Sequence, residues 1–221
     1  GPAACSRARR ALGLPEDAIV VGAVGRLTYQ KAPEDFLAAL RLLGRPGAVG
    51  VWVGGGELAG RVASLAGRQP GAPVILAGQR TDVPALLPAF DVFTLPSRYE
   101  GLPTAVVEAM VSGVPVVATA VNAVADLVVP GETGLLVPPR RPDLLAGAVR
   151  YLLDDPAAAA RMALAARTRL GDSYTVAALR EALTAAYAPA EADAGVGGQR
   201  RAFVRDLWLL SVAKISHLVM A

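Results

Sequence analysis

The sequence predicts an α/β fold in which helices cover both faces of a parallel β-sheet. Short runs of Val, Ile, Leu and Ala alternate along the chain with longer segments of helical period. Most of these runs lack the alternating polar residues of a half-exposed strand, which favours strands buried on both faces. The 221 residues are 53% hydrophobic and 5% aromatic, which is enough for the core of one domain.

The apolar runs, and the Gly and Pro residues between them, define the expected elements in order. Strands are expected at residues 18–24, 48–53, 73–77, 92–95, 114–119 and 134–137. Helical period, interrupted by Gly or Pro, predicts helices at residues 5–12, 33–43, 57–67, 83–90, 103–112, 124–128, 142–153, 156–170 and 175–187. These elements form one predicted domain over residues 1–188.

The last thirty residues differ in character from this domain. Small, acidic and Gly-rich residues predict a flexible linker at 189–201, and the apolar stretch at 202–221 predicts a C-terminal helix. From Leu207 the stretch is shorter than the roughly 20 apolar residues of a membrane-spanning helix. Three interpretations of residues 203–221 stay open: packing on the domain or a partner, contact with a membrane surface, or the start of a membrane helix.

Charge and cysteine content exclude several classes of function. The 22 Lys and Arg against 19 Asp and Glu leave a net charge of +3, and the arginines lie in small groups without interleaved aromatic residues, so no nucleic-acid partner is expected. Cys5 is the single cysteine, which forbids an internal disulfide and favours a cytoplasmic protein, with membrane association as the alternative. His217 is the single histidine, so no metal site is expected.

The segment PSRYEGLPTAVVEAM (96–110) is the strongest candidate site. Glu100 lies in a loop that follows the strand at 92–95, and ligands of open parallel sheets bind at the carboxyl ends of strands. A helix is expected to begin near Pro103, which leaves the amides of Gly101, Leu102 and Thr104 free to bind an anion such as phosphate. Spacing alone leaves open whether Glu100 binds a ligand or caps backbone amides.

Two further segments offer binding groups. Glu108 lies on the polar stripe of the same helix, where it projects into a cleft or simply into solvent. Arg26 and Lys31 flank a loop after the first strand, where two cations neutralise a diphosphate or are merely solvated. The segment GGGELA (54–59) formally fits a dinucleotide-binding pattern, but no acidic residue closes the next strand, so glycines for a tight turn and close packing are the alternative.

Taken in order, these segments resemble the C-terminal, donor-binding domain of retaining GT-B glycosyltransferases, the glycosyl transferases group 1. The two glutamates with seven residues between them, at positions 100 and 108, are the most specific part of the resemblance. The resembling stretches are VGAVGRLTYQKAPEDFLAAL (21–40), VWVGGGEL (51–58), residues 75–119 and residues 128–149. The resemblance implies a Rossmann-like domain that forms the C-terminal half of a GT-B fold.

The resemblance also implies a role for each matching residue. Arg26 and Lys31 hold the donor diphosphate and stabilise the leaving group, Glu108 accepts hydrogen bonds from the ribose, and Glu100 faces the donor sugar. The backbone at 101–104 completes the binding site for the phosphates and the sugar. The segment that meets the base matches Gln79, Arg80 and Thr81. The expected donor is a UDP or GDP sugar, with no cofactor and no metal, since the cations and the helix start do the electrostatic work.

The implied function is transfer of a hexose-type sugar to a glycan, lipid or small-molecule acceptor, as in polysaccharide biosynthesis. The family has an N-terminal acceptor domain that residues 1–17 are too few to encode, so an incomplete active site is expected. Asn122 to Asp126 stand where members often carry a Gly-Gly pair and a glutamate, which puts sugar contacts there in doubt. The alternative is a catalytically incomplete nucleotide-binding or interaction module, docked to a membrane or partner through residues 202–221.

Overall fold

The computed structural model describes residues 1–68 and 70–171. The chain divides into two units, Gly1–Arg167 and Thr168–Ala221, and the sheet and the candidate site belong to the first. The helix predicted at 175–187, the linker at 189–201 and the helix at 202–221 lie outside the described residues. The predicted domain boundary at residue 188 therefore stays a prediction.

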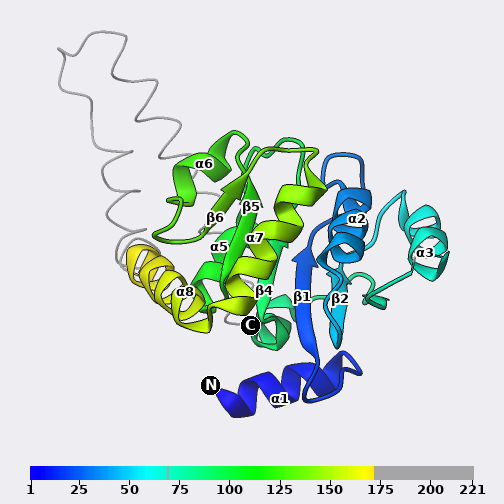
Figure 1. Ribbon diagram of the computed structural model, residues 1–221, viewed down its shortest axis with the longest axis horizontal. Helices are drawn as coiled ribbons and strands as arrows, with labels where there is room; N and C mark the ends of the chain where they lie inside the picture. The colour runs from blue at the N-terminus through cyan, green and yellow to red at the C-terminus, as the bar shows by residue number, and fades with distance from the viewer. Residues whose placement is uncertain (69, 172–221) are drawn as a thin grey trace, which may run out of the picture. The chain divides into compact units, whose positions relative to one another are not determined.

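Six parallel strands form one sheet in the order β3-β2-β1-β4-β5-β6 (Figure 1). The strands are β1 (Ile19–Val24), β2 (Ala48–Val53), β3 (Val74–Leu76), β4 (Val92–Leu95), β5 (Val116–Thr119) and β6 (Leu135–Val137). The chain moves outward from β1 to β3 and then crosses back to β4, on the other side of β1. Strand order thus reverses between β1 and β4, which is where open α/β sheets bind ligands.

Helices cover both faces of the sheet, as the apolar runs predict. Figure 1 shows α2 and α7 on one face and α5 on the other. The helices are α1 (Pro2–Ala11), α2 (Pro33–Leu43), α3 (Ala59–Arg68), α4 (Val83–Leu86), α5 (Thr104–Val111), α6 (Ala123–Leu127), α7 (Pro142–Asp154) and α8 (Pro156–Gly171), with a 3₁₀ turn η1 at Leu87–Ala89. All four residues of β4 and all four of β5 are buried, so neither strand has a solvent-facing side.

Three predicted helices differ from those observed by two residues or more at one end, and the first of them, predicted at 5–12, spans Pro2–Ala11. The helix predicted at 57–67 begins at Ala59, and Leu58 before it donates its amide hydrogen to the carbonyl oxygen of Leu27 in another loop. The segment predicted as one helix at 83–90 is a single α-helical turn followed by η1. Pro88 has no amide hydrogen with which to continue the α-helical pattern, so the chain tightens there.

One large part of the core lies between the sheet and the helices α2 and α7, and α5 buries Val106 and Met110 on the other face. Phe36 of α2 meets Trp52 of β2 edge to face, with ring centroids 5.4 Å apart. On β1, a Cβ at Gly22 would lie 2.1 Å from the ring of Phe90, so glycine is needed for that ring to pack against the strand.

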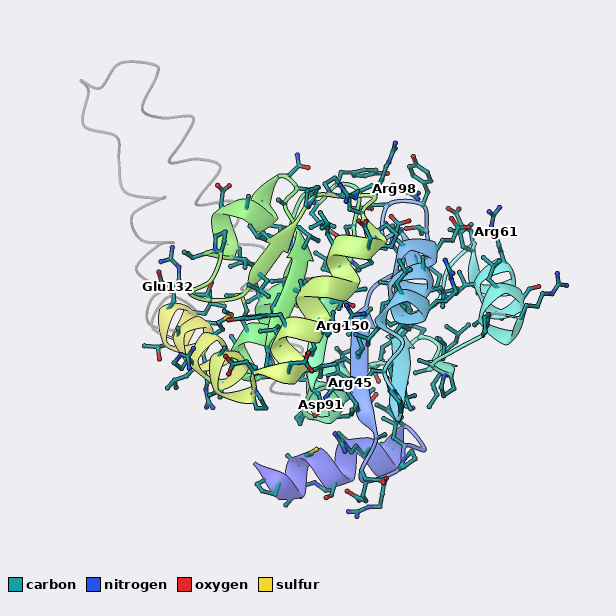
Figure 2. All side chains as sticks on the ribbon, viewed as in Figure 1. Arg45, Arg61, Asp91, Arg98, Glu132 and Arg150 are labelled. Atoms are coloured by element: carbon teal, nitrogen blue, oxygen red, sulfur yellow. The ribbon has the colours of Figure 1, made fainter. Side chains whose placement is uncertain are left out.

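The two edges of the sheet have different roles. At the amino edge, Asp91 accepts hydrogen bonds from the Arg9 guanidinium of α1 at 3.1 and 3.3 Å and from the Val20 amide at 2.7 Å. Figure 2 shows Asp91 beside α1 and Arg98 near the opposite edge. The amino edge is thus closed by an ion pair with α1, and the loops with the candidate residues lie at the carboxyl edge.

Candidate functional site at the carboxyl edge of the sheet

The loop that follows β1 (residues 25–32) and the loop that follows β4 (residues 96–103) are joined to each other at the point where strand order reverses. The Arg98 amide donates to the Gln30 carbonyl oxygen at 2.8 Å. The side-chain amide of Gln30 donates to the Tyr99 carbonyl oxygen at 3.1 Å. These reciprocal bonds fix one loop against the other, so residues 69 positions apart in sequence become neighbours.

Lys31 and Glu100 form a buried ion pair at this junction. Lys31 Nζ lies 2.6 Å from Glu100 Oε1, and the Ser97 hydroxyl donates to the same oxygen at 2.5 Å. The side chains are 16% and 2% exposed. Thr119 at the end of β5 donates its hydroxyl to the Ser97 carbonyl oxygen at 2.6 Å, which extends the polar network under the loop. A carboxylate with so little access to water needs these partners.

Arg26 lies in the same loop as Lys31, and the residue before it, Gly25, is hydrogen-bonded to the core. The side chain of Arg26 is exposed and forms no ion pair within the described part of the chain. The Gly25 carbonyl oxygen accepts a hydrogen bond from the indole nitrogen of buried Trp52 at 2.8 Å. The chain thus offers one fixed cation at Lys31, which is paired with Glu100, and one exposed cation at Arg26.

The Gly-rich segment supports this loop. A Cβ at Gly54 would lie 2.1 Å from the Gly25 carbonyl oxygen, and one at Gly56 would lie 2.5 Å from that of Leu27. The Leu27 amide donates to the Gly55 carbonyl oxygen at 2.8 Å. These glycines let two backbones touch, which is the packing alternative rather than a dinucleotide-binding turn that opens directly into a helix.

The start of α5 differs in part from the prediction. Helix α5 begins at Thr104 and Pro103 precedes it as the N-cap residue, with φ −82° and ψ 61°. The Thr104 amide donates to the Leu102 carbonyl oxygen at 2.9 Å, so the prediction that it is free is wrong, because the chain turns tightly at Pro103. The amides of Gly101 and Leu102 have no hydrogen-bond acceptor among the residues that the structure describes.

Glu108 lies one turn into α5 and is half-buried. Burial raises the pKa of its carboxyl above the ordinary value of 4.5, and no cation opposes this effect. Its carboxylate makes no hydrogen bond within residues 1–68 and 70–171. Glu108 is therefore a carboxyl group with unused acceptor capacity.

Gln79, Arg80 and Thr81 follow β3, two strands from β1. The Gly54 amide donates to the Gly78 carbonyl oxygen at 2.8 Å and anchors this loop to the Gly-rich segment. Arg80 donates two hydrogen bonds to Asp82, at 2.8 and 2.7 Å, and these bonds lower the pKa of Asp82. The structure does not bring these side chains into contact with Lys31 or Glu100, so the candidate residues lie at two places on the carboxyl edge.

Sequence reasoning missed three residues that hold the site together. Ser97 and Arg98 lie within the PSRYEGLP segment, which was singled out, but neither residue was given a role. No pattern indicated that Ser97 is fully buried beneath Glu100. Tyr29 carried no signal, because its stacking partner Arg98 lies on another strand's loop, with the guanidinium 4.0 Å from the ring centroid. Such contacts depend on the tertiary structure.

Two findings concern the described residues as a set. No three or more His, Cys, Asp or Glu side chains among them are grouped so that they could hold a metal ion. Within the same residues, no helix combines the length and the apolar character needed to cross a membrane.

The fold is that of a glycosyltransferase family. Residues 6–169 match the family model described as Glycosyl transferases group 1, and the chain belongs to that family. It is 37% identical over 160 residues to a glycogen synthase of Mycobacterium tuberculosis, covering 68% of this chain and 38% of that protein. It is 32% identical over 197 residues to the lipopolysaccharide core biosynthesis mannosyltransferase LpsB of Rhizobium meliloti, covering 82% of this chain and 55% of that protein.

Solved structures share the architecture. The structure of Anabaena HepE in complex with UDP-glucose superposes with a TM-score of 0.75 at 26% identity, covering 85% of this chain and 54% of HepE. The C-terminal domain of the group 1 protein LpcC from Francisella tularensis gives a TM-score of 0.65 at 22% identity, covering 78% of this chain and 93% of that domain, a likeness of fold alone. The expected Rossmann-like half of a GT-B fold is confirmed, and the chain spans about half or less of the length of the curated relatives.

Proposed function

We propose that this chain is the sugar-nucleotide-binding part of a retaining glycosyltransferase, which transfers a hexose-type sugar from a nucleoside diphosphate to a glycan, lipid or small-molecule acceptor. The observation that carries the proposal is the junction of the two loops at the strand reversal, where Lys31 and Glu100 meet beside the start of α5. HepE, a structural relative, was solved with UDP-glucose, which supports a nucleotide sugar as the donor.

In this proposal the diphosphate binds between the two loops. Arg26 supplies a planar fork and Lys31 a point charge, and the Gly101 and Leu102 amides donate hydrogen bonds at the start of α5. The charge that grows on the leaving diphosphate is stabilised by groups that are already in place, because Glu100 and Ser97 fix the Lys31 ammonium. No step requires a metal ion.

The remaining proposed contacts orient the donor. Glu108 accepts hydrogen bonds from the ribose hydroxyls, which would replace the water that its carboxylate has lost through burial. Glu100 faces the donor sugar, and the loop with Gln79, Arg80 and Thr81 meets the base. We expect UDP or GDP as the nucleotide.

The acceptor half of the reaction is also a proposal. The chain covers 38% and 55% of its two relatives, so we propose that acceptor binding uses residues outside this sequence. We therefore expect little or no transfer by the 221-residue chain alone. Robust transfer by the purified chain would contradict this expectation.

Calorimetric titration of the chain with UDP, GDP, ADP and their glucose conjugates tests the binding function. We expect one nucleotide series to bind, and Lys31→Met to weaken it at least about tenfold, because a charge-assisted contact to the diphosphate is lost. Arg61→Met on α3 is the matched control, since its side chain is 69% exposed and pairs with Glu34 on the surface. If no nucleotide binds, or if both variants bind like wild type, the proposal fails.

The alternative, an interaction module without catalysis, depends on residues 202–221, which lie outside the described residues. Flotation with lipid vesicles, comparing the full chain with a chain that lacks residues 203–221, separates membrane docking from nucleotide binding.

A further inference from the structure

Arg98 contacts the β1–α2 loop and the first turn of α2 through its backbone and through three parts of its side chain. Its amide donates to the Gln30 carbonyl oxygen at 2.8 Å, and Nη1 donates to the Tyr29 carbonyl oxygen at 3.1 Å. The guanidinium carbon lies 4.0 Å from the centroid of the Tyr29 ring. Nη2 lies 3.9 Å from Asp35 Oδ1, in the first turn of α2. One residue of the β4–α5 loop thus contacts the second half of the β1–α2 loop and the first turn of α2.

Tyr29 is held from a second direction. Arg140, in the loop between β6 and α7, donates from Nη2 to the Tyr29 hydroxyl at 2.9 Å. The ring therefore contacts guanidinium groups from two different loops and is still 54% exposed. An exposed ring contributes little to a core, so its contacts restrain the loop rather than fill space.

Arg98 is incompletely paired for a buried arginine. Its side chain is 14% exposed, and its Nε has no hydrogen-bond partner within the described residues, nor have Asp35 Oδ2 and the Thr28 hydroxyl. Burial raises the pKa of Asp35, and the positive charge of Arg98 opposes that effect. Leaving buried polar atoms unpaired costs stability, so stability alone does not account for this arrangement, and a functional reason is favoured.

We infer that Arg98 is a positioning residue that holds the β1–α2 loop so that Arg26 and Lys31 meet the donor diphosphate. The inference rests on the proposed function of that loop. The link to Lys31 is short, because Nη1 of the Arg98 side chain donates to the carbonyl oxygen of Tyr29, two residues before Lys31, and the Arg98 backbone amide donates to that of the next residue, Gln30. Glu100, the partner of Lys31, follows Arg98 by two residues, so one anchor sets the positions of both members of the pair.

This role depends on the shape of arginine and not only on its charge. A planar guanidinium can stack on Tyr29 and donate to a carbonyl oxygen at the same time, whereas a lysine ammonium cannot do both. Arg98→Lys keeps the positive charge near the diphosphate site and loses the stack. If Arg98 acted by direct attraction for the diphosphate, that variant would keep the affinity.

Hydrogen exchange of the unliganded chain, read by mass spectrometry, tests the restraint itself. We expect amides of residues 26–31 to exchange at least about tenfold faster in Arg98→Met and Arg98→Lys, while those of β1 and β4 keep their wild-type rates. If an Arg98 variant fails to fold, Tyr29→Leu, a change at an exposed residue, takes its place, and the same faster exchange is expected. Arg61→Met is the control. Unchanged exchange at 26–31 overturns the inference.

Calorimetry with UDP tests the path through the loop. We expect Arg98→Lys and Arg98→Met each to weaken binding about five- to tenfold, but to cost less than about twofold when Lys31→Met is already present, because the loop has then lost the cation it positions. Wild-type affinity in Arg98→Lys, or an undiminished loss in the double variant, overturns the inference. If the wild-type chain binds no nucleotide, the proposed function fails, and the exchange experiment still decides whether Arg98 restrains the loop.

Discussion

Replacing Lys31 by Met removes the cation that faces the buried carboxylate of Glu100 and keeps most of the side-chain volume. Glu100 is 2% exposed, and its Oε1 accepts hydrogen bonds from Lys31 and Ser97. In the variant, the Ser97 hydroxyl is the partner that remains for a carboxylate almost without access to water. Removing one partner of a buried ion pair costs about 3–5 kcal/mol, and the retained Ser97 bond sets our expected loss of unfolding free energy at about 3 kcal/mol.

The expected loss is asymmetric between the two partners. Glu100→Gln keeps an oxygen that accepts from Ser97 and Lys31, and Lys31 is 16% exposed, so we expect a loss of about 1 kcal/mol. Arg61→Met breaks a pair whose arginine is 69% exposed and should cost less than about 1 kcal/mol. The ranking follows from the exposure of each side chain and from the acceptor oxygen that Gln keeps.

Urea unfolding followed by far-ultraviolet circular dichroism measures these differences, with equal m-values as the check that the same surface is exposed. The double variant Lys31→Met/Glu100→Gln should lose less than the sum of the single losses, by more than about 1 kcal/mol, because each change removes the same pair. A Lys31→Met variant as stable as Arg61→Met would refute the reasoning, since Glu100 would then not be desolvated in the way its burial implies.

Two further predictions concern Glu108 and the Gly-rich loop. Because burial raises the pKa of Glu108 above 4.5, the folded chain holds this proton where the unfolded chain has lost it, and stability falls as pH rises through that range. Glu108→Gln should therefore raise the melting temperature at pH 7 and leave it unchanged at pH 4, and an equal melting temperature at pH 7 would contradict this. The same variant should bind UDP more weakly, and an unaltered affinity would contradict the proposed ribose contact. Gly54→Ala would place a Cβ 2.1 Å from the Gly25 carbonyl oxygen at φ +139° and should lower the unfolding free energy by more than about 2 kcal/mol, whereas Gly55→Ala, with its nearest contact at 4.0 Å, should cost less than about 0.5 kcal/mol in the same urea titration.

Strands of the sheet centre were predictable because burial on both faces leaves a continuous apolar run in the sequence. β2 and β4 have the predicted bounds, and β1 begins one residue later. Short strands were harder: the runs at 73–77 and 134–137 contain only three strand residues each, because β3 and β6 are the edge strands and each pairs with one neighbour only. Periodicity also gave no warning that the segment at 83–90 tightens into a 3₁₀ turn.

The candidate site was predictable in composition but not in its contacts. The motif around Glu100 and Glu108 is local, so its residues could be named from the sequence together with Arg26 and Lys31. The direct pairing of Lys31 with Glu100 could not, since no spacing rule relates residues 69 apart on different strands. The buried support from Ser97 was hidden for the same reason.

By itself the sequence determined which chemical groups stand at the ends of strands: two cations after the first strand, and two carboxyl groups around a helix start after the fourth. Tertiary structure alone decided that one cation, Lys31, meets one carboxyl group, Glu100. The crossover from β3 back to β4 places β4 against β1, so the two loops leave the same edge of the sheet side by side. That adjacency depends on strand order, which is set by how helices pack on both faces rather than by any local pattern in the chain.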